Sequence, residues 1–273
     1  MAQLDPVLSQ VILVLLLSAL GAVAGFFAGL LGIGGGAVLV PGLYYVFKDY
    51  GFTESAMHVA VATSVVSIVF TGASSTRAHY RLGNLDRDLL KQFLPGIAFG
   101  SIVASFLIGQ LSTQALIWVF AGLQLAFGSY MLVRSKTIAL FSRLPKQPWF
   151  SLIAAINGLT ATIMGVGGGV QNVLFLTLCS YPLKPAIGTS AGVGFCMAIV
   201  ASLGYMFSSA PQASVIPGTL GLVNIFALIP IVCMSILTAP IGAKLVARLP
   251  QQLIKRIFTL FVLVISIKML LAH

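Results

Sequence analysis

The sequence predicts an all-α polytopic membrane protein built from two inverted repeats. Each repeat is expected to contain a glycine-tipped broken-helix hairpin and three transmembrane helices. Three observations support this prediction: an apolar composition, two matching glycine clusters, and an uneven distribution of Lys and Arg. Of the 273 residues, 59% are hydrophobic and 7% are charged. Because a soluble domain needs about 25% charged residues to cover its surface, this chain is expected to be integral to a membrane.

The first repeat is expected to span residues 1–134 and opens with an uncharged apolar run at 9–31. No basic region precedes this run and no small-residue cleavage site follows it, so a removed signal peptide is not expected. The cluster Gly32-Ile-Gly-Gly-Gly36 then interrupts the apolar sequence. The arm after it, 35–47, would be only about 20 Å long as a helix, shorter than a hydrocarbon core of about 30 Å. We therefore expect a hairpin, followed by transmembrane helices at 57–76, 92–110 and 113–133.

The second repeat is expected at residues 149–273, after a cytoplasmic linker at 135–148, and the two halves are expected to form one structural unit. Its cluster, Gly165-Val-Gly-Gly-Gly169, lies about 133 residues after the first and is also followed by a short arm, 169–181. Two glycine breaks in register indicate an internal duplication with a site at the breaks. The other expected helices lie at 149–165, 186–207, 219–243 and 257–271.

The positions of Lys and Arg predict the orientation of these helices. Connections 77–91, 134–146 and 244–256 are rich in Lys and Arg and are expected to be cytoplasmic. Connections 110–113 and 208–218 carry no charge and are expected outside. The matching helices 57–76 and 186–207 then cross in opposite directions, which makes the repeats inverted, and both chain ends external if each hairpin returns to its own side. This topology accounts for the net charge of +10, so nucleic acid is not an expected partner.

The glycine clusters are the first candidate substrate-binding elements. Glycine permits a tight turn and a close approach of a ligand to backbone N–H groups. A helix that begins just after the turn adds free N–H donors and a partial positive charge, which favour an anion. Inverted repeats would bring two such helix ends to one point near the midplane; the alternative is that the glycines only permit close helix packing. The candidates are Gly34, Gly35, Gly36, Gly167, Gly168 and Gly169.

Two hydroxyl pairs at matching positions are the second candidate, Thr63-Ser64 and Thr189-Ser190. Hydroxyl groups donate to oxyanions without adding a fixed charge, which suits a site that must also release its ligand. Hydrogen bonding between helices is the alternative explanation.

Gln171 and Asn172 follow the second glycine cluster, where the first half has Val38 and Leu39. Amide side chains on one side of the site would give the bound ligand a direction. Capping of the short helix explains them equally well.

His58, Arg77 and Arg81 are candidates for a gate or for anion recruitment. His58 begins the helix at 57–76, near the predicted outer face, where it could sense pH or simply lie at the interface. Arg77 and Arg81 cluster with His79 and Tyr80 at the cytoplasmic end of the same helix. These cations could draw anions toward an inner mouth, but membrane topology alone also explains the arginines.

The positions of the acidic residues bear on whether transport could be coupled to a proton or a sodium ion. All five, Asp5, Asp49, Glu54, Asp86 and Asp88, lie in connections or near the N-terminus. Carriers driven by protons or sodium commonly use an intramembrane carboxylate, so coupling through one is not expected. The apolar runs also hold no carboxylate pair, no Ser/His/Asp set and no metal-ligand spacing, so we expect neither an enzyme nor a metal or cofactor site.

Four sequence elements resemble those of the TauE/SafE sulfite exporter (TSUP) family, across essentially the whole chain. They are Gly29-Leu-Leu-Gly-Ile-Gly-Gly-Gly36 with Pro41 after it, Met164-Gly-Val-Gly-Gly-Gly169, Ala62-Thr-Ser64 and Gly188-Thr-Ser190. The second copy departs from the first, because Leu174 stands at the position matching Pro41.

The resemblance implies a multi-pass protein of the inner (plasma) membrane that transports small sulfur-containing anions such as sulfite, sulfoacetate or other organosulfonates, often outward. The expected partners are this anion and the lipid bilayer, and an oligomer is possible. A secondary transporter working by alternating access is the first hypothesis. An anion channel or facilitator for small oxyanions or carboxylates is the alternative, and a membrane scaffold subunit would leave the paired helix breaks unexplained.

Overall fold

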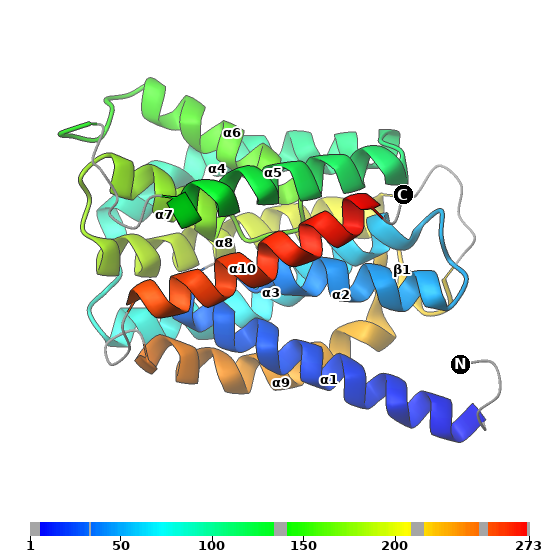
Figure 1. The fold of residues 1–273 in the computed structure, drawn as a ribbon. Helices are drawn as coiled ribbons and strands as arrows, with labels where there is room; N and C mark the ends of the chain where they lie inside the picture. Colours follow the sequence, from blue (N-terminus) through cyan, green and yellow to red (C-terminus); the bar gives the residue numbers. More distant parts are fainter. Residues whose placement is uncertain (1–5, 33, 134–140, 209–215, 246–250, 272–273) are drawn as a thin grey trace.

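The computed structural model describes residues 6–32, 34–133, 141–208, 216–245 and 251–271, and these form a bundle of ten α-helices (Figure 1). The helices are α1 (Pro6–Leu31), α2 (Gly36–Asp49), α3 (Ala56–Arg81), α4 (Arg87–Leu107), α5 (Thr113–Val133), α6 (Trp149–Ile163), α7 (Gly169–Leu178), α8 (Leu183–Phe207), α9 (Ile225–Leu245) and α10 (Gln251–Leu271). The prediction of an all-α membrane protein is confirmed, and all ten predicted apolar segments are helices. Among the described residues, five helices are long and apolar enough to cross a membrane: α1, α3, α4 with the 3-10 turn Ile108–Gln110, α8 and α9.

The start of α9 differs from the sequence prediction. The segment predicted as helical from residue 219 begins instead with two short strands, β1 (Thr219–Leu220) and β2 (Val223–Asn224), which pair antiparallel. Gly218 and Gly221 adopt positive φ angles of 79° and 59°, which a right-handed helix cannot accommodate. Helix α9 therefore starts only at Ile225.

Helices from the two halves interleave rather than forming separate bodies. α1 packs along α9, and α4 packs along α6; α3 contacts α8 and α9, α8 contacts α4, and α5 packs on α10. In Figure 1, α1 and α9 lie side by side along the lower edge of the bundle. The helices α1 to α5 of the first half correspond in order to α6 to α10 of the second. Exchanging each helix for its counterpart leaves the contacts named above unchanged.

Glycine lets the backbones of these paired helices touch. On α1, Gly21, Gly25 and Gly29 recur every four residues and face α9; a Cβ at Gly29 would lie 1.8 Å from the carbonyl oxygen of Ala239. In the equivalent pair, a Cβ at Gly100 of α4 would lie 2.0 Å from the carbonyl oxygen of Ala155 in α6. Such close approach is the usual role of small residues between membrane helices.

Hydrogen bonds join neighbouring connections, and the sidedness predicted from the charge pattern stays a prediction. At one end, Phe141 N–H donates to the carbonyl of Leu178, and Tyr181 donates to Asp86. At the other end, the N–H of Leu222 donates to the carbonyl of Tyr205. Residues 134–140, 209–215 and 246–250, which include parts of three predicted connections, lie outside the described residues.

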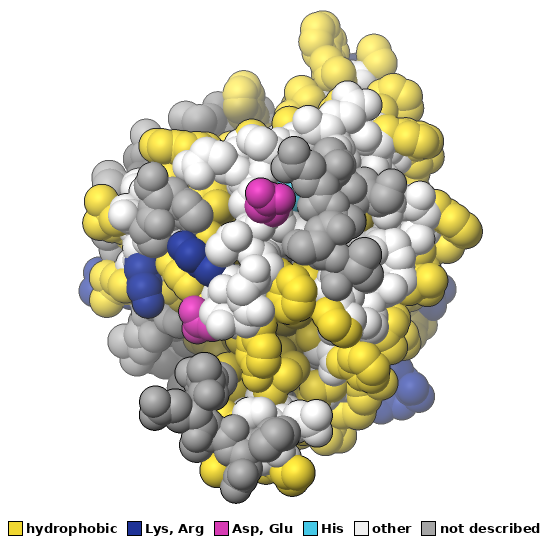
Figure 2. Space-filling view, turned by 90° about the vertical axis from the view of Figure 1, so that its right-hand side faces the viewer, with side chains coloured by type: hydrophobic (Ala, Val, Ile, Leu, Met, Phe, Trp, Pro, Cys, Tyr) yellow, Lys and Arg dark blue, Asp and Glu magenta, His cyan; other side chains and the backbone are white. Residues whose placement is uncertain are grey.

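α1 begins and α10 ends at the same end of the bundle (Figure 1). Charged side chains are few and scattered on that face, among hydrophobic and uncharged polar ones (Figure 2). Around the bundle, large apolar side chains face outward, including Phe106 (75% exposed) and Phe226 (70% exposed). Exposed apolar side chains on this scale fit a protein surrounded by lipid. α3 and α8, by contrast, are mostly buried and form the centre of the bundle.

Candidate functional site

Both glycine clusters form turns that require glycine. We call the described residues 32 and 34–36, between α1 and α2, the first glycine turn, and residues 165–169, between α6 and α7, the second. Gly34 and Gly35 have φ angles of 72° and 82°, and Gly165 and Gly168 have φ angles of 68° and 65°. Residues with an L side chain rarely adopt this left-handed conformation, whereas glycine, which lacks a Cβ, does so readily. Gly35 and Gly168 are the N-cap residues of α2 and α7, so each turn delivers the chain directly into a helix N-terminus.

The two glycine turns touch each other. A Cβ at Gly34 would lie 3.1 Å from the Cα of Gly167, and a Cβ at Gly36 would lie 2.1 Å from the carbonyl oxygen of Gly165. The structure thus brings the two predicted clusters together, although they are more than a hundred residues apart in sequence. No side chain separates the two backbones at this contact, so glycine is required on both sides.

α3 and α8 hold the paired turns from either side. On α3, the Oγ of Ser64 donates to the carbonyl oxygen of Gly165 at 2.8 Å. On α8, Gly194 faces the second turn, with a Cβ position 2.4 Å from the carbonyl oxygen of Gly167. Ser190, the counterpart of Ser64, is fully buried, and its hydroxyl has no hydrogen-bond partner among the described residues. Ser64 is therefore bonded to the second turn, and a role of Ser190 in binding a substrate stays a prediction.

The threonines of the two pairs connect one half of the protein to the other. The Oγ1 of Thr63 accepts from the N–H of Asn224 at 2.9 Å, and the Oγ1 of Thr189 accepts from the N–H of Asp86 at 3.0 Å. Asn224 precedes α9 and caps it by accepting from the N–H of Ala227 at 2.8 Å. These contacts match the alternative of hydrogen bonding between helices. A role of either hydroxyl in binding a substrate stays a prediction.

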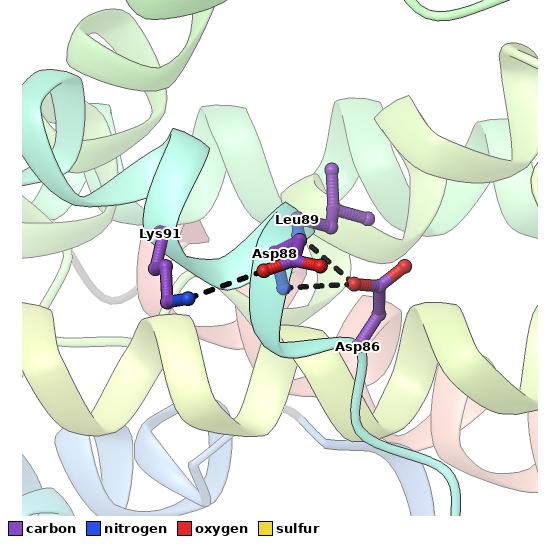
Figure 3. A network of polar contacts seen from close by, with 4 residues as sticks. All are labelled: Asp86, Asp88, Leu89 and Lys91. Atoms are coloured by element: carbon purple, nitrogen blue, oxygen red, sulfur yellow. Dashed lines mark hydrogen bonds and ion pairs between the residues drawn. The ribbon is translucent and has the colours of Figure 1, made fainter.

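Asp86 caps α4 and also joins two connections. Its Oδ1 accepts from the N–H groups of Leu89 and Asp88 at 2.9 and 3.0 Å (Figure 3), and its Oδ2 accepts from the hydroxyl of Tyr181 at 2.6 Å. The N–H of Leu89, the hydroxyl of Tyr181 and the N–H of Asp88 hold the pKa of the Asp86 carboxyl below its usual 3.8, against the opposing effect of partial burial. The ionised form is the one that the fold stabilises.

Replacing Asp86 by alanine is expected to lower the free energy of unfolding by about 1 kcal/mol at pH 7, because an N-cap is lost. The folded pKa is depressed, so this stabilisation is complete above the unfolded pKa near 3.8 and disappears as the pH falls through the lower folded value. Thermal unfolding in detergent should therefore separate the variant from the wild type at pH 7, and the difference should shrink as the pH falls below 3.8 and vanish below the folded pKa. Asp88→Ala is the control, since Asp88 makes an exposed ion pair with Lys91 at 3.2 Å (Figure 3). An equal loss in both variants would contradict the capping role.

Amide side chains gather at the second turn alone. The Oε1 of Gln171 accepts from Thr160 at 3.1 Å, and the Oδ1 of Asn172 accepts from the Nδ2 of Asn157 at 3.1 Å. The Nδ2 of Asn172 is buried and has no partner among the described residues. The matching positions of the first half are apolar: Ala24, Phe27, Val38 and Leu39. The polarity difference predicted for Gln171 and Asn172 thus extends to the helix before the turn.

The structure places the gate candidates away from the paired turns. The Nε2 of His58 lies 2.9 Å from the carbonyl oxygen of Leu111, in the connection between α4 and α5. Arg77 and Arg81 are exposed at the opposite end of α3. Their role in recruiting anions stays a prediction.

His79, rather than the neighbouring arginines, reaches the first hairpin. Its Nε2 lies 2.9 Å from the carbonyl oxygen of Gly29, near the end of α1. Its counterpart on α8, Tyr205, donates to the carbonyl oxygen of Thr162 at 2.8 Å, near the end of α6. Carbonyl groups at helix ends lack partners within the helix, so these two side chains fix the ends of both hairpins in the same way.

Sequence reasoning missed several buried polar residues near the turns. α3 carries a row of buried hydroxyl groups that follows Ser64 toward the C-terminal end of the helix, at Ser67, Thr71 and Ser75. Gln124 of α5 and Thr259 of α10 are also buried. The available signal was an isolated polar residue in an otherwise apolar run, which averaging over a long hydropathy window conceals.

The arrangement of donors suits an anion. The first N–H groups of α2 and α7 have no acceptor within their helices, and the hydroxyl and amide groups around the second turn are neutral. No carboxylate lies among the described residues that contact the two turns. Neutral donors beside a helix N-terminus bind an oxyanion without an opposing charge.

Comparison with known proteins identifies the family of the chain. A family model described as sulfite exporter TauE/SafE matches residues 17–269. The chain is 33% identical over 260 residues to a "Probable membrane transporter protein" of Haemophilus influenzae, covering 94% of this chain and 98% of the relative. It is 26% identical to the "Probable membrane transporter protein YunE" of Bacillus subtilis, covering 71% and 78% of the two chains, and no solved structure matches it. The protein is therefore a multi-pass membrane transporter that belongs to the TauE/SafE sulfite exporter family.

Proposed function

We propose that the protein is a secondary transporter, acting as an exporter, for small sulfur-containing anions such as sulfite, sulfoacetate and other organosulfonates. One observation carries this proposal: the glycine turns of the two halves touch in the buried centre, and each opens into a helix N-terminus. Backbone N–H groups at such ends favour anionic groups. The family name supports sulfur oxyanions as the substrate class.

The transport mechanism that we propose is alternating access between two inverted repeats. The exchange symmetry of the helix contacts supports it, because swapping the roles of the halves would reproduce the same contacts on the opposite face. The hairpins α1–α2 and α6–α7 would carry the binding turns. α3 and α8 would form the fixed centre, since both are mostly buried and contact each other.

Outward movement of an anion is favoured without a coupled proton or sodium ion. An inside-negative membrane potential contributes about 2.3 kcal/mol per charge for each 100 mV. In the proposed orientation in the inner membrane, the end of the bundle that carries Asp86 and Tyr181 faces the cytoplasm. An exporter for a toxic or surplus anion would then need only the potential and the concentration gradient.

Purified protein in liposomes tests the proposal. Labelled sulfite or sulfoacetate loaded inside should leave these liposomes faster than it leaves protein-free liposomes. The rate should saturate with concentration and rise when the interior is made negative. Unlabelled anion outside should accelerate the exit of labelled anion, because a carrier exchanges its substrate. Flux without saturation and without exchange would favour the channel. Flux equal to that of protein-free liposomes would reject both the transporter and the channel.

A further inference from the structure

A small cavity of about 20 Å³ lies beside the second glycine turn, on the side that faces α5 and α10. Its lining includes Gln124 and Gly128 of α5, Thr259 and Val262 of α10, and Gly168 and Gln171 at the start of α7. A cavity of this size has room for about one water molecule or one oxygen atom of a ligand. The cavity therefore adjoins the proposed anion site at the glycine turns, and it is lined partly by α5 and α10, which lie outside the two hairpins.

Two side chains that line this cavity have unpaired polar atoms. Gln124 is 5% exposed and Thr259 is 1% exposed. The Nε2 of Gln124 and the Oγ1 of Thr259 have no hydrogen-bond partner among the described residues. Most buried polar groups in folded proteins are paired, and an unpaired one calls for a water, an ion or a ligand. Two residues with unpaired polar groups line this one cavity, which makes it a candidate binding site.

Comparison of the repeats shows that packing does not require polar residues here. α5 and α10 are counterparts of equal length, beginning at Thr113 and Gln251. In this alignment Gln124 matches Val262, and Thr259 matches Ala121, both of which are buried. The fold accepts apolar residues at the matching positions, so the polar pair at the second turn has another cause.

We propose that Gln124 and Thr259 bind an oxygen of the transported oxyanion and place it against the second glycine turn, away from the midpoint between the two turns. The amide N–H and the hydroxyl donate, and the N-terminus of α7 adds free N–H groups beside them. This inference rests on the proposed function. The cavity has room for one such oxygen, so in this proposal the whole anion enters when α5 and α10 move away from the turn.

Two variants remove these donors with little change in shape, Gln124→Leu and Thr259→Val. Two others on the same helices serve as matched controls. Gln114→Leu removes an exposed amide from α5. Ser266→Ala removes a buried α10 hydroxyl that already donates to the carbonyl of Val262 at 2.8 Å. All four proteins are purified in detergent, and each is also reconstituted into liposomes.

The measurements are the KM for sulfite and sulfoacetate flux, and the unfolding temperature with and without sulfite. Each site variant is expected to raise KM by about tenfold, because it removes one hydrogen bond to a charged group. Its unfolding temperature without sulfite should equal or exceed that of the wild type, because an unpaired buried group is gone, while the stabilisation by sulfite should shrink. The controls should keep the wild-type KM.

The outcomes separate the site from the function. If the wild type transports sulfite and both site variants keep its KM, the cavity holds an ordered water only and this inference fails alone. If sulfite stabilises the wild type and not the variants, but no flux occurs, the site stands and the proposed function fails. If sulfite neither stabilises the wild type nor crosses the membrane, both fail.

Discussion

Replacing Gly36 by alanine is expected to reduce anion flux by at least about tenfold, although it adds one methyl group. The new Cβ would lie 2.1 Å from the carbonyl oxygen of Gly165 and 2.7 Å from the Cα of Val166. Both are backbone atoms, which cannot rotate away as a flexible side chain can. Gly36 has no positive φ angle, so the substitution adds no backbone strain of its own. The whole effect must come from separating the two turns.

Overpacking of this kind costs about 1–3 kcal/mol, and the separation also moves two helix N-termini apart. The second turn and the N-terminus of α7 would then shift relative to the other donors around the anion. Flux of sulfite and sulfoacetate in liposomes measures the effect, and far-UV circular dichroism checks that the helices are retained. Gly122→Ala is the control, because a Cβ on this exposed α5 residue meets nothing within 4 Å. Wild-type flux in the Gly36 variant would show that contact between the turns is not needed for transport.

The largest loss of stability is expected from Gly29→Ala, at the contact between α1 and α9. A Cβ there would lie 1.8 Å from the carbonyl oxygen of Ala239 and 2.8 Å from the N atom of Ala243. The two helix backbones must move apart, and the packing along α1 is lost with them. We expect a cost of about 3 kcal/mol, at the upper end for overpacking. Gly100→Ala should have a similar effect between α4 and α6, where the Cβ would lie 2.0 Å from the carbonyl oxygen of Ala155.

Thermal unfolding in detergent, followed by circular dichroism, measures both losses. Because the two contacts are separate, the double variant should lose nearly the sum of the single losses. Gly122→Ala should again behave as the wild type or slightly better, since alanine favours a helix over glycine by roughly 0.5–1 kcal/mol. An unchanged unfolding temperature in Gly29→Ala would mean that α1 is not held by this contact.

Much of the fold could be predicted because the bilayer imposes simple constraints on sequence. Long apolar runs mark helices, and a glycine cluster inside such a run marks a break, so both hairpins were predictable. The C-terminal end of α3 was underestimated, because the helix continues through Arg77 to Arg81 beyond the apolar run. Arginine is a good helix former, and hydropathy alone places a helix end too early where a helix leaves the membrane.

The site was harder to predict, because its partners are distant in sequence. Thr63 was selected as a possible ligand of the substrate, yet it bonds the backbone of Asn224, 161 residues away. No sequence pattern around Thr63 indicates that contact. Gln124 and Thr259 were missed for a related reason: each lies alone in an apolar helix, and only the fold places both at one cavity. The glycine turns themselves were identified because their conformational requirement is local.

The pairing of α1 with α9 has a consequence for how the protein is made. α1 ends at Leu31 and α9 begins at Ile225, so the ribosome must add nearly two hundred residues before the partner exists. At a synthesis rate of roughly 5–20 residues per second, the glycine face of α1 stays without its native partner for about 10 to 40 seconds. During that time it is open to pairing with other newly inserted helices. The order of synthesis thus makes α1 one of the last helices to acquire its native packing.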